Sequence, residues 1–422
     1  MDSARQSHPC FNPDAAGSCA RVHLPVAPKC NVLCNYCNRK YDCQNESRPG
    51  VTSAILSPAQ AIAYLDEVMG KMPEISVVGI AGPGDPMANP AETLGTIRRI
   101  RERHPRLLVC LSSNGLGLPA HLDEIAELGI THTTVTMNAV DLAVGQQFYR
   151  WVRDGKVLYR GIGAAELMLE RQMQSIRGLK ERGITVKVNT IVTPGVNDSH
   201  VEDIARVAAG LGVDLLNLIP LYPTGDTPFG HLPEPSPKTM EELRARAQQY
   251  LPQMRHCRRC RADAVGLLAC DRSREMAPRL IAHAQSRPEL SAGRPHVAVA
   301  TREGLLVNHH LGEASSFQVW GRSPEGYVLI GSRPAPPPGG GGKRWFALAE
   351  VLKDCRAVLV SGIGETPRII LEEAGVSPVV MDGLIQQGLA AAYEGINPSI
   401  FGKRQAKSCI RGCSGNSGIG CG

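Results

Sequence analysis

Four cysteines fall within fourteen residues, in the sequence CNVLCNYCNRKYDC from 30 to 43. Cys30, Cys34 and Cys37 have the spacing C-x3-C-x2-C, which chance would produce only about 0.015 times in a chain with this cysteine content. Three thiolates on a cluster of four irons leave one iron open for a reactive group, whereas a zinc site usually takes four ligands in two pairs. The triad therefore predicts an iron–sulfur cluster with an open iron, and Cys43 stands apart from it.

The residues between about 22 and 220 alternate short β-branched segments with amphipathic helical segments. The predicted strands are 22–26, 75–82, 107–113, 132–138, 185–192 and 214–220. A helix is expected to begin at Ser57, which suits an N-cap, because Pro58 suits the first helical position. Six βα units predict an α/β fold in which a parallel sheet curls into a partial TIM-type (βα)6 barrel.

In such barrels the chemistry gathers at the carboxyl ends of the strands. The cysteine cluster follows the first predicted strand. The residues that end or follow the other strands are Gly82, Gly84 and Asp85, then Asn114, Asn138, Thr193 and Tyr222. Loops from six strands therefore converge on one rim, as a large active site requires.

The composition narrows the class of protein. Lys plus Arg exceeds Asp plus Glu by 46 − 40 = 6, and only 4% of the residues are aromatic, which argues against a nucleic-acid partner. The first residues, MDSARQSHPC, do not resemble a signal peptide, and no apolar segment is long enough for a membrane span. We therefore expect a cytoplasmic protein with no membrane partner. In that reducing compartment, its 14 cysteines would bind metals or do chemistry rather than form disulfides.

The triad in the loop after the first strand of a six-fold βα barrel resembles the radical S-adenosylmethionine (SAM) superfamily. The resemblance implies a 4Fe–4S cluster whose open iron chelates the amino and carboxylate groups of SAM, and cleavage of SAM to a 5′-deoxyadenosyl radical. It also implies that the turn AGPGDP, with Gly82, Gly84 and Asp85, contacts SAM, although alone it is only a turn. The other predicted cofactor-binding residues are Tyr36, Asn114, Asn138 and Thr193.

A longer string, HPCFN…RVHLPVAPKCNVLCNYCNRKYDCQNESRPGVTS, resembles the signature of the NifB family of nitrogenase cofactor maturases. Further matches occur at CLSSNGLGLP, at HCRRCRADAVG and in the Cys/Gly-rich tail. The resemblance implies two further 4Fe–4S clusters, fused around a carbide from a SAM methyl group, with a ninth sulfur added to give an 8Fe–9S–C precursor. It also implies cluster-delivery and cofactor-scaffold proteins of nitrogenase assembly, and a reductant protein, as partners.

The NifB resemblance implies two sets of ligands for these additional clusters. One cluster would be held by Cys10, Cys257 and Cys260, and the other by Cys43, Cys110 and a nitrogen ligand, for which His23 is the best match.

Each of these assignments has a plainer alternative. The C-x2-C pair could be half a zinc knuckle or a chance pair, Cys110 could be a small hydrophobic residue of a strand, and His23 could be a core histidine. The sequence also departs from the family at AAGSCAR, where other members carry a pair of histidines, and Cys19 there is unexplained.

The string NESRPG follows Cys43 directly. Glu46 and Arg48 could form only a surface ion pair, which contributes little stability. Within the NifB resemblance, this motif lies beside the SAM site, so both residues are predicted to be catalytic, with Glu46 handling a proton or orienting SAM.

The sequence patterns divide the whole chain into three parts. The barrel and its extensions are expected over 1–292, a smaller strand-rich α/β domain over 293–402, and a flexible Cys/Gly-rich tail over 403–422. VNHHLGEASSFQVW and GIGETP resemble the NifX-type nitrogenase accessory domain, whose family role is to hold or pass on cofactor precursors. His309 and His310 could be ligands there or merely face solvent, and sequence gives the tail cysteines, Cys409, Cys413 and Cys421, no definite role.

The sequence thus predicts a radical SAM maturase, an enzyme of lyase or transferase type. Two other hypotheses stay open. One is a radical SAM enzyme with auxiliary clusters that acts on a peptide or a small molecule, and the other is a non-enzymatic iron–sulfur carrier or scaffold. The carrier hypothesis does not explain why a SAM-type triad sits at the rim of a barrel.

Overall fold

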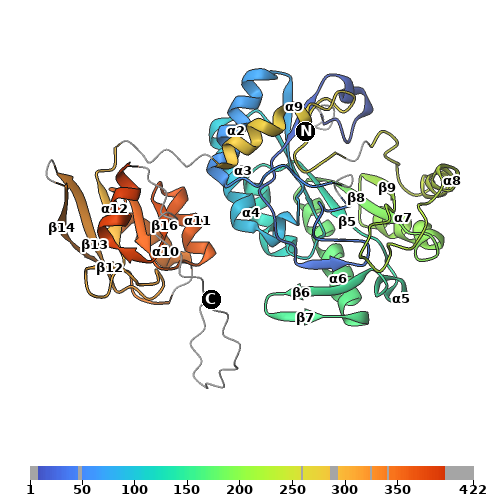
Figure 1. Ribbon diagram of the computed structural model, residues 1–422. Coiled ribbons are helices and arrows are strands. Elements are labelled where there is room, and N and C mark those ends of the chain that lie inside the picture. Colours follow the sequence, from blue (N-terminus) through green and yellow to red (C-terminus); the bar gives the residue numbers. More distant parts are fainter. Residues whose placement is uncertain are drawn as a thin grey trace. The chain divides into compact units, whose positions relative to one another are not determined.

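The computed structural model describes residues 8–45, 50–257, 260–285, 293–323, 326–339 and 342–394. Contacts within the chain divide it into two compact units, Met1–Ser286 and Arg287–Gly422 (Figure 1). In the described part of the chain, no helix is both long enough and apolar enough to cross a membrane. The predicted tail, 403–422, lies outside the described residues.

The described part of the first unit is built on a seven-stranded sheet of order β10-β1-β3-β4-β5-β8-β9. Neighbouring strands from β1 to β9 are parallel, which confirms the predicted α/β architecture. These strands are β1 (Ala20–His23), β3 (Ile75–Ile80), β4 (Leu108–Ser113), β5 (His132–Thr136), β8 (Thr185–Val192) and β9 (Leu215–Pro220). The first strand was expected to run on to residue 26, but it ends at His23 because Pro25 has no N–H to continue the ladder.

Helices that follow the strands pack around the sheet and close its apolar core (Figure 1). They are α2 (Pro58–Lys71), α3 (Pro90–Arg103), α4 (Leu122–Glu127), α6 (Gly161–Glu181), α7 (Val201–Gly210) and α8 (Pro237–Ala247), with short helical turns η2 (Pro86–Ala88), η3 (Leu118–His121), η4 (Asp198–His200) and α5 (Leu142–Gly145) between them. Ser57 caps α2 in a complete capping box with Gln60, as its sequence predicts.

Two features of the first unit were not expected from local sequence patterns. A second small sheet joins β2 (Val32–Cys34) to β6 (Tyr149–Asp154) and β7 (Val157–Tyr159). Because β2 carries Cys34, this antiparallel pairing fixes the first half of the cysteine loop. The N-terminal segment also forms a short turn, η1 (Pro13–Gly17), before β1.

The segment after α8 joins the two edges of the parallel sheet. The N–H of Met254 donates to the carbonyl of Leu216 in β9 at 2.8 Å, and β10 (Val265–Gly266) pairs antiparallel with β1. The segment between these two attachments carries Cys257 and Cys260. The extension therefore brings two cysteines to the open side of the partial barrel.

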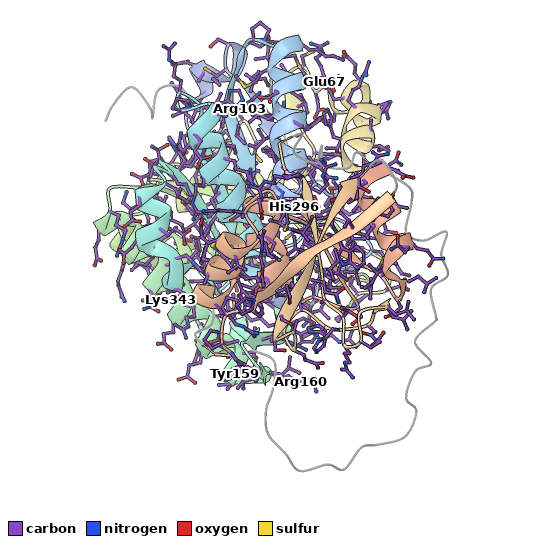
Figure 2. The ribbon with its side chains drawn as sticks, turned by 90° about the vertical axis from the view of Figure 1, so that its left-hand side faces the viewer. Glu67, Arg103, Tyr159, Arg160, His296 and Lys343 are labelled. Atoms are coloured by element: carbon purple, nitrogen blue, oxygen red, sulfur yellow. The ribbon has the colours of Figure 1, made fainter. Side chains whose placement is uncertain are left out.

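Helix α9 (Ser273–Gln285) completes this extension and packs against α2. Glu67 of α2 accepts a hydrogen bond from His283 of α9 at 2.8 Å and lies 3.4 Å from Arg279; Figure 2 shows Glu67 on the helix beside α9. These contacts anchor the C-terminal end of the extension.

The second unit, within its described residues, is a five-stranded sheet of order β14-β13-β11-β15-β16 covered by three helices. Its elements are β11 (His296–Val299), β12 (Leu306–Val307), β13 (Ser316–Ser323), β14 (Gly326–Pro334), α10 (Gly342–Val351), β15 (Cys355–Val360), α11 (Glu365–Glu373), β16 (Ser377–Val380), β17 (Gly383–Leu384) and α12 (Ile385–Glu394). It has its own apolar clusters on both faces of the sheet, in keeping with a separate α/β domain.

Candidate functional site

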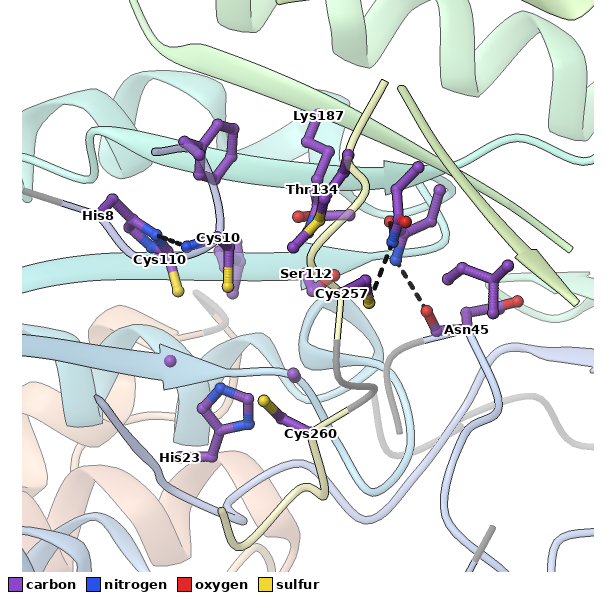
Figure 3. A pocket seen from close by; sticks show the side chains of 18 of the residues that line it. His8, Cys10, His23, Asn45, Cys110, Ser112, Thr134, Lys187, Cys257 and Cys260 are labelled. Carbon is purple, nitrogen blue, oxygen red and sulfur yellow. Dashed lines mark hydrogen bonds between the residues drawn. The ribbon is translucent and has the colours of Figure 1, made fainter. Parts of the chain in front are cut away.

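Two adjoining pockets occupy the first unit. The smaller, here named the triad pocket, has an empty volume of about 410 Å³ and contains Cys30, Cys34 and Cys37. The larger, here named the barrel cavity, has an empty volume of about 680 Å³ and contains His23, Cys110, Cys10, Cys257 and Cys260 (Figure 3). Asn45 and Ser112 line both pockets and so form their common wall.

The triad cysteines are held partly buried against an apolar group that includes Tyr36 and Phe148. Burial raises the pKa of Cys30 to about 12, and it also raises the pKa of the Cys34 and Cys37 thiols. Thiols in such surroundings become thiolates only where positive charge offsets the desolvation, and metal ions supply that charge.

The triad cysteines suit a cluster, in which the sulfurs bind different metal ions. Among the described residues, no three His, Cys, Asp or Glu side chains converge on a point where a single metal ion could bind. In an iron–sulfur cubane each thiolate binds a different iron, so the sulfurs need not share one point. The three triad thiols therefore fit a 4Fe–4S cluster.

Asp85 organises the wall of the triad pocket. Its carboxylate accepts hydrogen bonds from the N–H of Asn114 at 2.6 Å, from the N–H of Met87 at 2.8 Å and from the hydroxyl of Ser113 at 3.1 Å. Gly84 lies so close to the chain before Cys30 that a Cβ there would collide with the Lys29 carbonyl. The AGPGDP turn thus fixes the backbone on either side of the cysteine loop.

Tyr36 and Asn138 are joined by a hydrogen bond. The Asn138 amide donates to the Tyr36 hydroxyl at 3.0 Å, and that hydroxyl donates to Asn45 Oδ1 at 2.6 Å. Gly82, Asn138 and Thr193 are not in the lining of either pocket, and Thr193 is buried with its N–H on Asn197 at 2.8 Å. Asn114 does line the triad pocket, and its amide reaches 3.8 Å from the Cys30 sulfur.

His23 faces the barrel cavity from the end of β1. Its Nδ1 donates to the carbonyl of Arg261 at 2.8 Å, which leaves the Nε2 lone pair available, and burial lowers the pKa of the ring to about 4. A Cβ on Gly79 would lie 2.9 Å from His23 Nε2 and 3.3 Å from Cys110 Sγ. The imidazole of His23 and the thiol of Cys110 therefore face the same space beside Gly79. Two ligands of one cluster would have to face a common space in this way.

The sulfurs of two other cavity cysteines, Cys257 and Cys260, accept hydrogen bonds from neighbouring side chains. Arg21 donates to Cys260 Sγ at 3.3 Å, and Asn217 donates to Cys257 Sγ at 3.5 Å. Burial raises the pKa of Cys10 to about 11. Hydrogen bonds to the sulfur stabilise a thiolate and tune a bound cluster, so this set also fits cluster ligation.

Two protein families match separate parts of this chain. Residues 24–208 match the Radical SAM superfamily, and residues 294–395 match the family described as dinitrogenase iron-molybdenum cofactor. The FeMo cofactor biosynthesis protein NifB of Chlorobaculum tepidum is 48% identical over 419 residues, which are 99% of each chain. The NifB of Klebsiella pneumoniae is 40% identical over 406 residues, covering 89% of this chain and 87% of the relative.

The chain belongs to the NifB family. It is therefore a radical SAM protein of FeMo cofactor biosynthesis, with the partial-barrel fold and a NifX-like C-terminal domain, as the sequence predicted. Membership of the superfamily implies one 4Fe–4S cluster and SAM, which the triad pocket fits.

One predicted grouping of this NifB chain is not assembled in the structure. Cys43 lines the triad pocket, whereas His23 and Cys110 line the barrel cavity. The Cys43 N–H donates to the carbonyl of Pro83 at 2.9 Å, which keeps it beside the AGPGDP turn. The two predicted catalytic residues after it, Glu46 and Arg48, lie outside the described residues.

The remaining predicted residues that the structure describes do not line either pocket. Tyr222 is exposed, and Cys19 is only partly buried, with its sulfur 3.9 Å from the Ser18 hydroxyl. In the NifX-like unit, Nδ1 of His310 accepts the N–H of Gly312 at 3.1 Å, and His309 is partly exposed. The tail cysteines lie outside the described residues.

Several pocket residues were missed by sequence reasoning. They are His8, Asn45, Gly79, Ser112, Lys187, Asn189 and Asn217; Arg21 was also missed, and it contacts Cys260 from outside the lining. For Ser112 a signal existed, because it lies two residues after Cys110 in the same strand and must face the same side. The others are placed by contacts distant in sequence.

Proposed function

We propose that this NifB-family protein fuses two 4Fe–4S clusters with insertion of a SAM-derived carbide and a ninth sulfur, giving the 8Fe–9S–C precursor of the nitrogenase cofactor. The observation that carries the proposal is the pair of adjoining pockets. One contains the SAM-type triad, the other contains six further cysteine and histidine side chains, and Asn45 with Ser112 separates them.

In the triad pocket, Cys30, Cys34 and Cys37 would hold the resident cluster. When bound, this cluster and SAM supply a 5′-deoxyadenosyl radical through transfer of one electron to SAM, with methionine as the other product. Asp85 orients the Asn114 backbone and the turn after Gly84, so its role is to hold the groups that contact SAM. The remaining SAM-side residues in the proposal are Gly82, Tyr36, Asn138 and Thr193.

In the barrel cavity, His23 and Cys110 would hold one substrate cluster and Cys10, Cys257 and Cys260 the other. We propose that Cys43 is the third ligand of the first set, although it lines the triad pocket in this structure. Two 4Fe–4S clusters supply eight irons and eight sulfurs, so the product also requires a sulfur donor and one carbon. A buried, largely apolar cavity would keep water away from these reactive species.

Glu46 and Arg48 are proposed to act beside the SAM site, with Glu46 handling a proton or orienting SAM. The NifX-like domain, proposed to span 293–402, would hold or pass on the product, and 403–422 would be a tail. Cluster-delivery proteins, a cofactor scaffold and a reductant protein are the proposed partners. A reducing cytoplasm is the proposed location, since every cysteine assigned here must remain a thiol.

The test is the iron content and SAM chemistry of the anaerobically reconstituted protein. The proposal expects about twelve irons per chain, in three clusters of four, and cleavage of SAM on reduction. About four irons with SAM cleavage would leave only another kind of radical SAM enzyme. Bound zinc without SAM cleavage would contradict any radical SAM role, and iron without SAM cleavage would favour a carrier.

A variant tests the assignment of the ligands. Replacing Cys10, Cys257 and Cys260 together with Ala should remove about four irons and leave SAM binding intact. An unchanged iron content would show that this ligand set is wrong.

A further inference from the structure

Strand β4 and the residue that follows it bring three polar side chains to the two pockets. Cys110 and Ser112 face the same side because they are alternate residues of the strand, and Asn114 directly follows the strand, which ends at Ser113. Cys110 lines the barrel cavity, Asn114 lines the triad pocket, and Ser112 between them lines both. Ser112 therefore marks the shortest path along this strand from one pocket to the other.

The Ser112 hydroxyl is buried without a partner. The side chain is only 7% exposed, and its Oγ makes no hydrogen bond to any described residue. The next residue differs, because the Ser113 hydroxyl donates to Asp85 at 3.1 Å. A buried hydroxyl without a partner costs about 1–3 kcal/mol, so the orphaned group indicates that a bound species supplies its partner.

The other side of the shared wall is already occupied by hydrogen bonds. Asn45 Oδ1 accepts from the Tyr36 hydroxyl at 2.6 Å, and its carbonyl accepts from the Asn189 amide at 2.8 Å. Asn189 in turn accepts from Asn217 at 3.0 Å, and Asn217 reaches Cys257. Asn45 is thus held by hydrogen bonds from both sides, and Ser112 Oγ is the polar side-chain atom of this wall that is buried without a hydrogen bond to a described residue. Figure 3 shows Ser112 between Cys110 and Asn45 in this view.

We infer that Ser112 positions the substrate cluster at this wall, with its hydroxyl donating a hydrogen bond to a cluster sulfide that faces the triad pocket. The inference rests on the proposed function and deepens it. Sulfides accept hydrogen bonds and cannot donate them, and a hydroxyl can donate to an anionic acceptor. The sulfide held in this way faces the SAM side of the wall, so it is the sulfide that accepts the methyl group: its S–C bond forms as the sulfonium–methyl bond of SAM breaks, and S-adenosylhomocysteine leaves.

The test uses the Ser112→Ala and Ser112→Thr variants of the full chain, reconstituted anaerobically. Ser112→Ala should keep about twelve irons and the change that SAM causes in the paramagnetic resonance spectrum of the reduced triad cluster. Its ratio of methyl carbon transferred to 5′-deoxyadenosine formed should fall about tenfold, as expected for losing one hydrogen bond to a charged group. Ser112→Thr, which keeps the hydroxyl, should restore most of the ratio.

A second measurement does not depend on turnover. Hydrogen bonds to cluster sulfur raise the reduction potential, so a redox titration without SAM should show a more negative substrate-cluster potential in Ser112→Ala. The matched control is Ser76→Ala, which deletes a hydroxyl from the neighbouring strand β3 outside both pockets and should change neither quantity.

The inference requires that Ser112→Ala lower the transfer ratio and also make the substrate-cluster potential more negative. An unchanged transfer ratio or an unchanged potential would overturn it, and so would a loss of iron, because the hydroxyl would then support ligation or folding. Failure of the proposed function has a different signature, since the wild-type protein itself would then bind about four irons.

Discussion

The triad pocket and the barrel cavity differ in how their polar groups are satisfied. In the triad pocket the carboxylate of Asp85 accepts several hydrogen bonds, and Asn114 and Tyr36 are bonded within the protein. In the barrel cavity, His8 Nε2 and Asn217 Oδ1 are buried without a hydrogen-bond partner among the described residues. Ser112 Oγ, on the shared wall, is another such atom.

The difference indicates two kinds of site. Polar groups that are already paired hold a fixed geometry, which suits a reagent that is used again in every cycle. Groups left without partners destabilise the empty protein by about 1–3 kcal/mol each, and they regain partners when a substrate enters. Under the proposed function, the triad pocket would suit a resident cluster, and the barrel cavity would suit clusters that arrive and leave.

The largest effect should come from removing the cysteines of the triad pocket while leaving those of the barrel cavity in place. Replacing Cys30, Cys34 and Cys37 together with Ala should reduce SAM cleavage to background, at least about 1000-fold, because the triad pocket would lose the cluster that binds SAM. Iron content should fall only from about twelve to about eight, as measured by colorimetric assay and Mössbauer spectroscopy. Loss of all iron would show that the pockets do not load independently.

Gly79→Ala should affect the barrel cavity alone. The added Cβ would meet the His23 ring at under 3 Å, so the ring must move and the nitrogen ligand should be lost while SAM cleavage continues. Pulsed paramagnetic resonance should show that the nitrogen coupling to a substrate cluster has disappeared. The control is Gly70→Ala in α2, where nothing lies within 4 Å of a new Cβ. Persistent nitrogen coupling in Gly79→Ala would exclude His23 as the ligand.

Arg21→Met should destabilise the protein by about 3 kcal/mol, because the buried guanidinium ties β1 to the extension. Its side chain is 3% exposed and donates to the carbonyls of Gly266 and Leu267, to Cys260 and to Asp271. Urea denaturation of the iron-free protein measures the loss. Arg255→Met is the control and should cost under about 0.5 kcal/mol, since its ion pair is exposed. An equal effect of both variants would mean that Arg21 does not hold the extension.

Asp85→Asn should have the smallest effect, a loss of about 1–2 kcal/mol in the free energy of unfolding. The amide retains one acceptor oxygen but cannot accept from the donors around both carboxylate oxygens. The exposed Asp14→Asn should be silent in the same denaturation experiment. A silent Asp85→Asn would contradict the view that the triad pocket is held by paired polar groups.

Sequence patterns predicted what depends on local chemistry. The alternating segments gave the parallel strands, the Ser57–Pro58 pair gave the start of α2, and the spacing of Cys30, Cys34 and Cys37 gave the triad pocket. Each of these follows from residues close together in the chain, whose periodicity or capping is visible in sequence.

What the sequence could not reveal depends on contacts distant in the chain. The attachment of β10 to β1 and the bond of Arg21 to Asp271, 250 residues away, bring Cys260 to the cavity. The placement of Cys43 in the triad pocket depends on its backbone contact with Pro83. No periodicity records such contacts, because they arise from packing between elements.

The most direct test of carbon transfer between the two pockets follows the methyl carbon of SAM. SAM labelled with ¹³C at the methyl group would be incubated with the fully reconstituted, reduced protein, and the isolated cluster product examined by electron–nuclear double resonance. A carbon that crosses the wall at Ser112 should give ¹³C coupled to the iron–sulfur product. Recovery of all the label in methionine and unreacted SAM, with no coupling in the product, would contradict the proposed fusion chemistry.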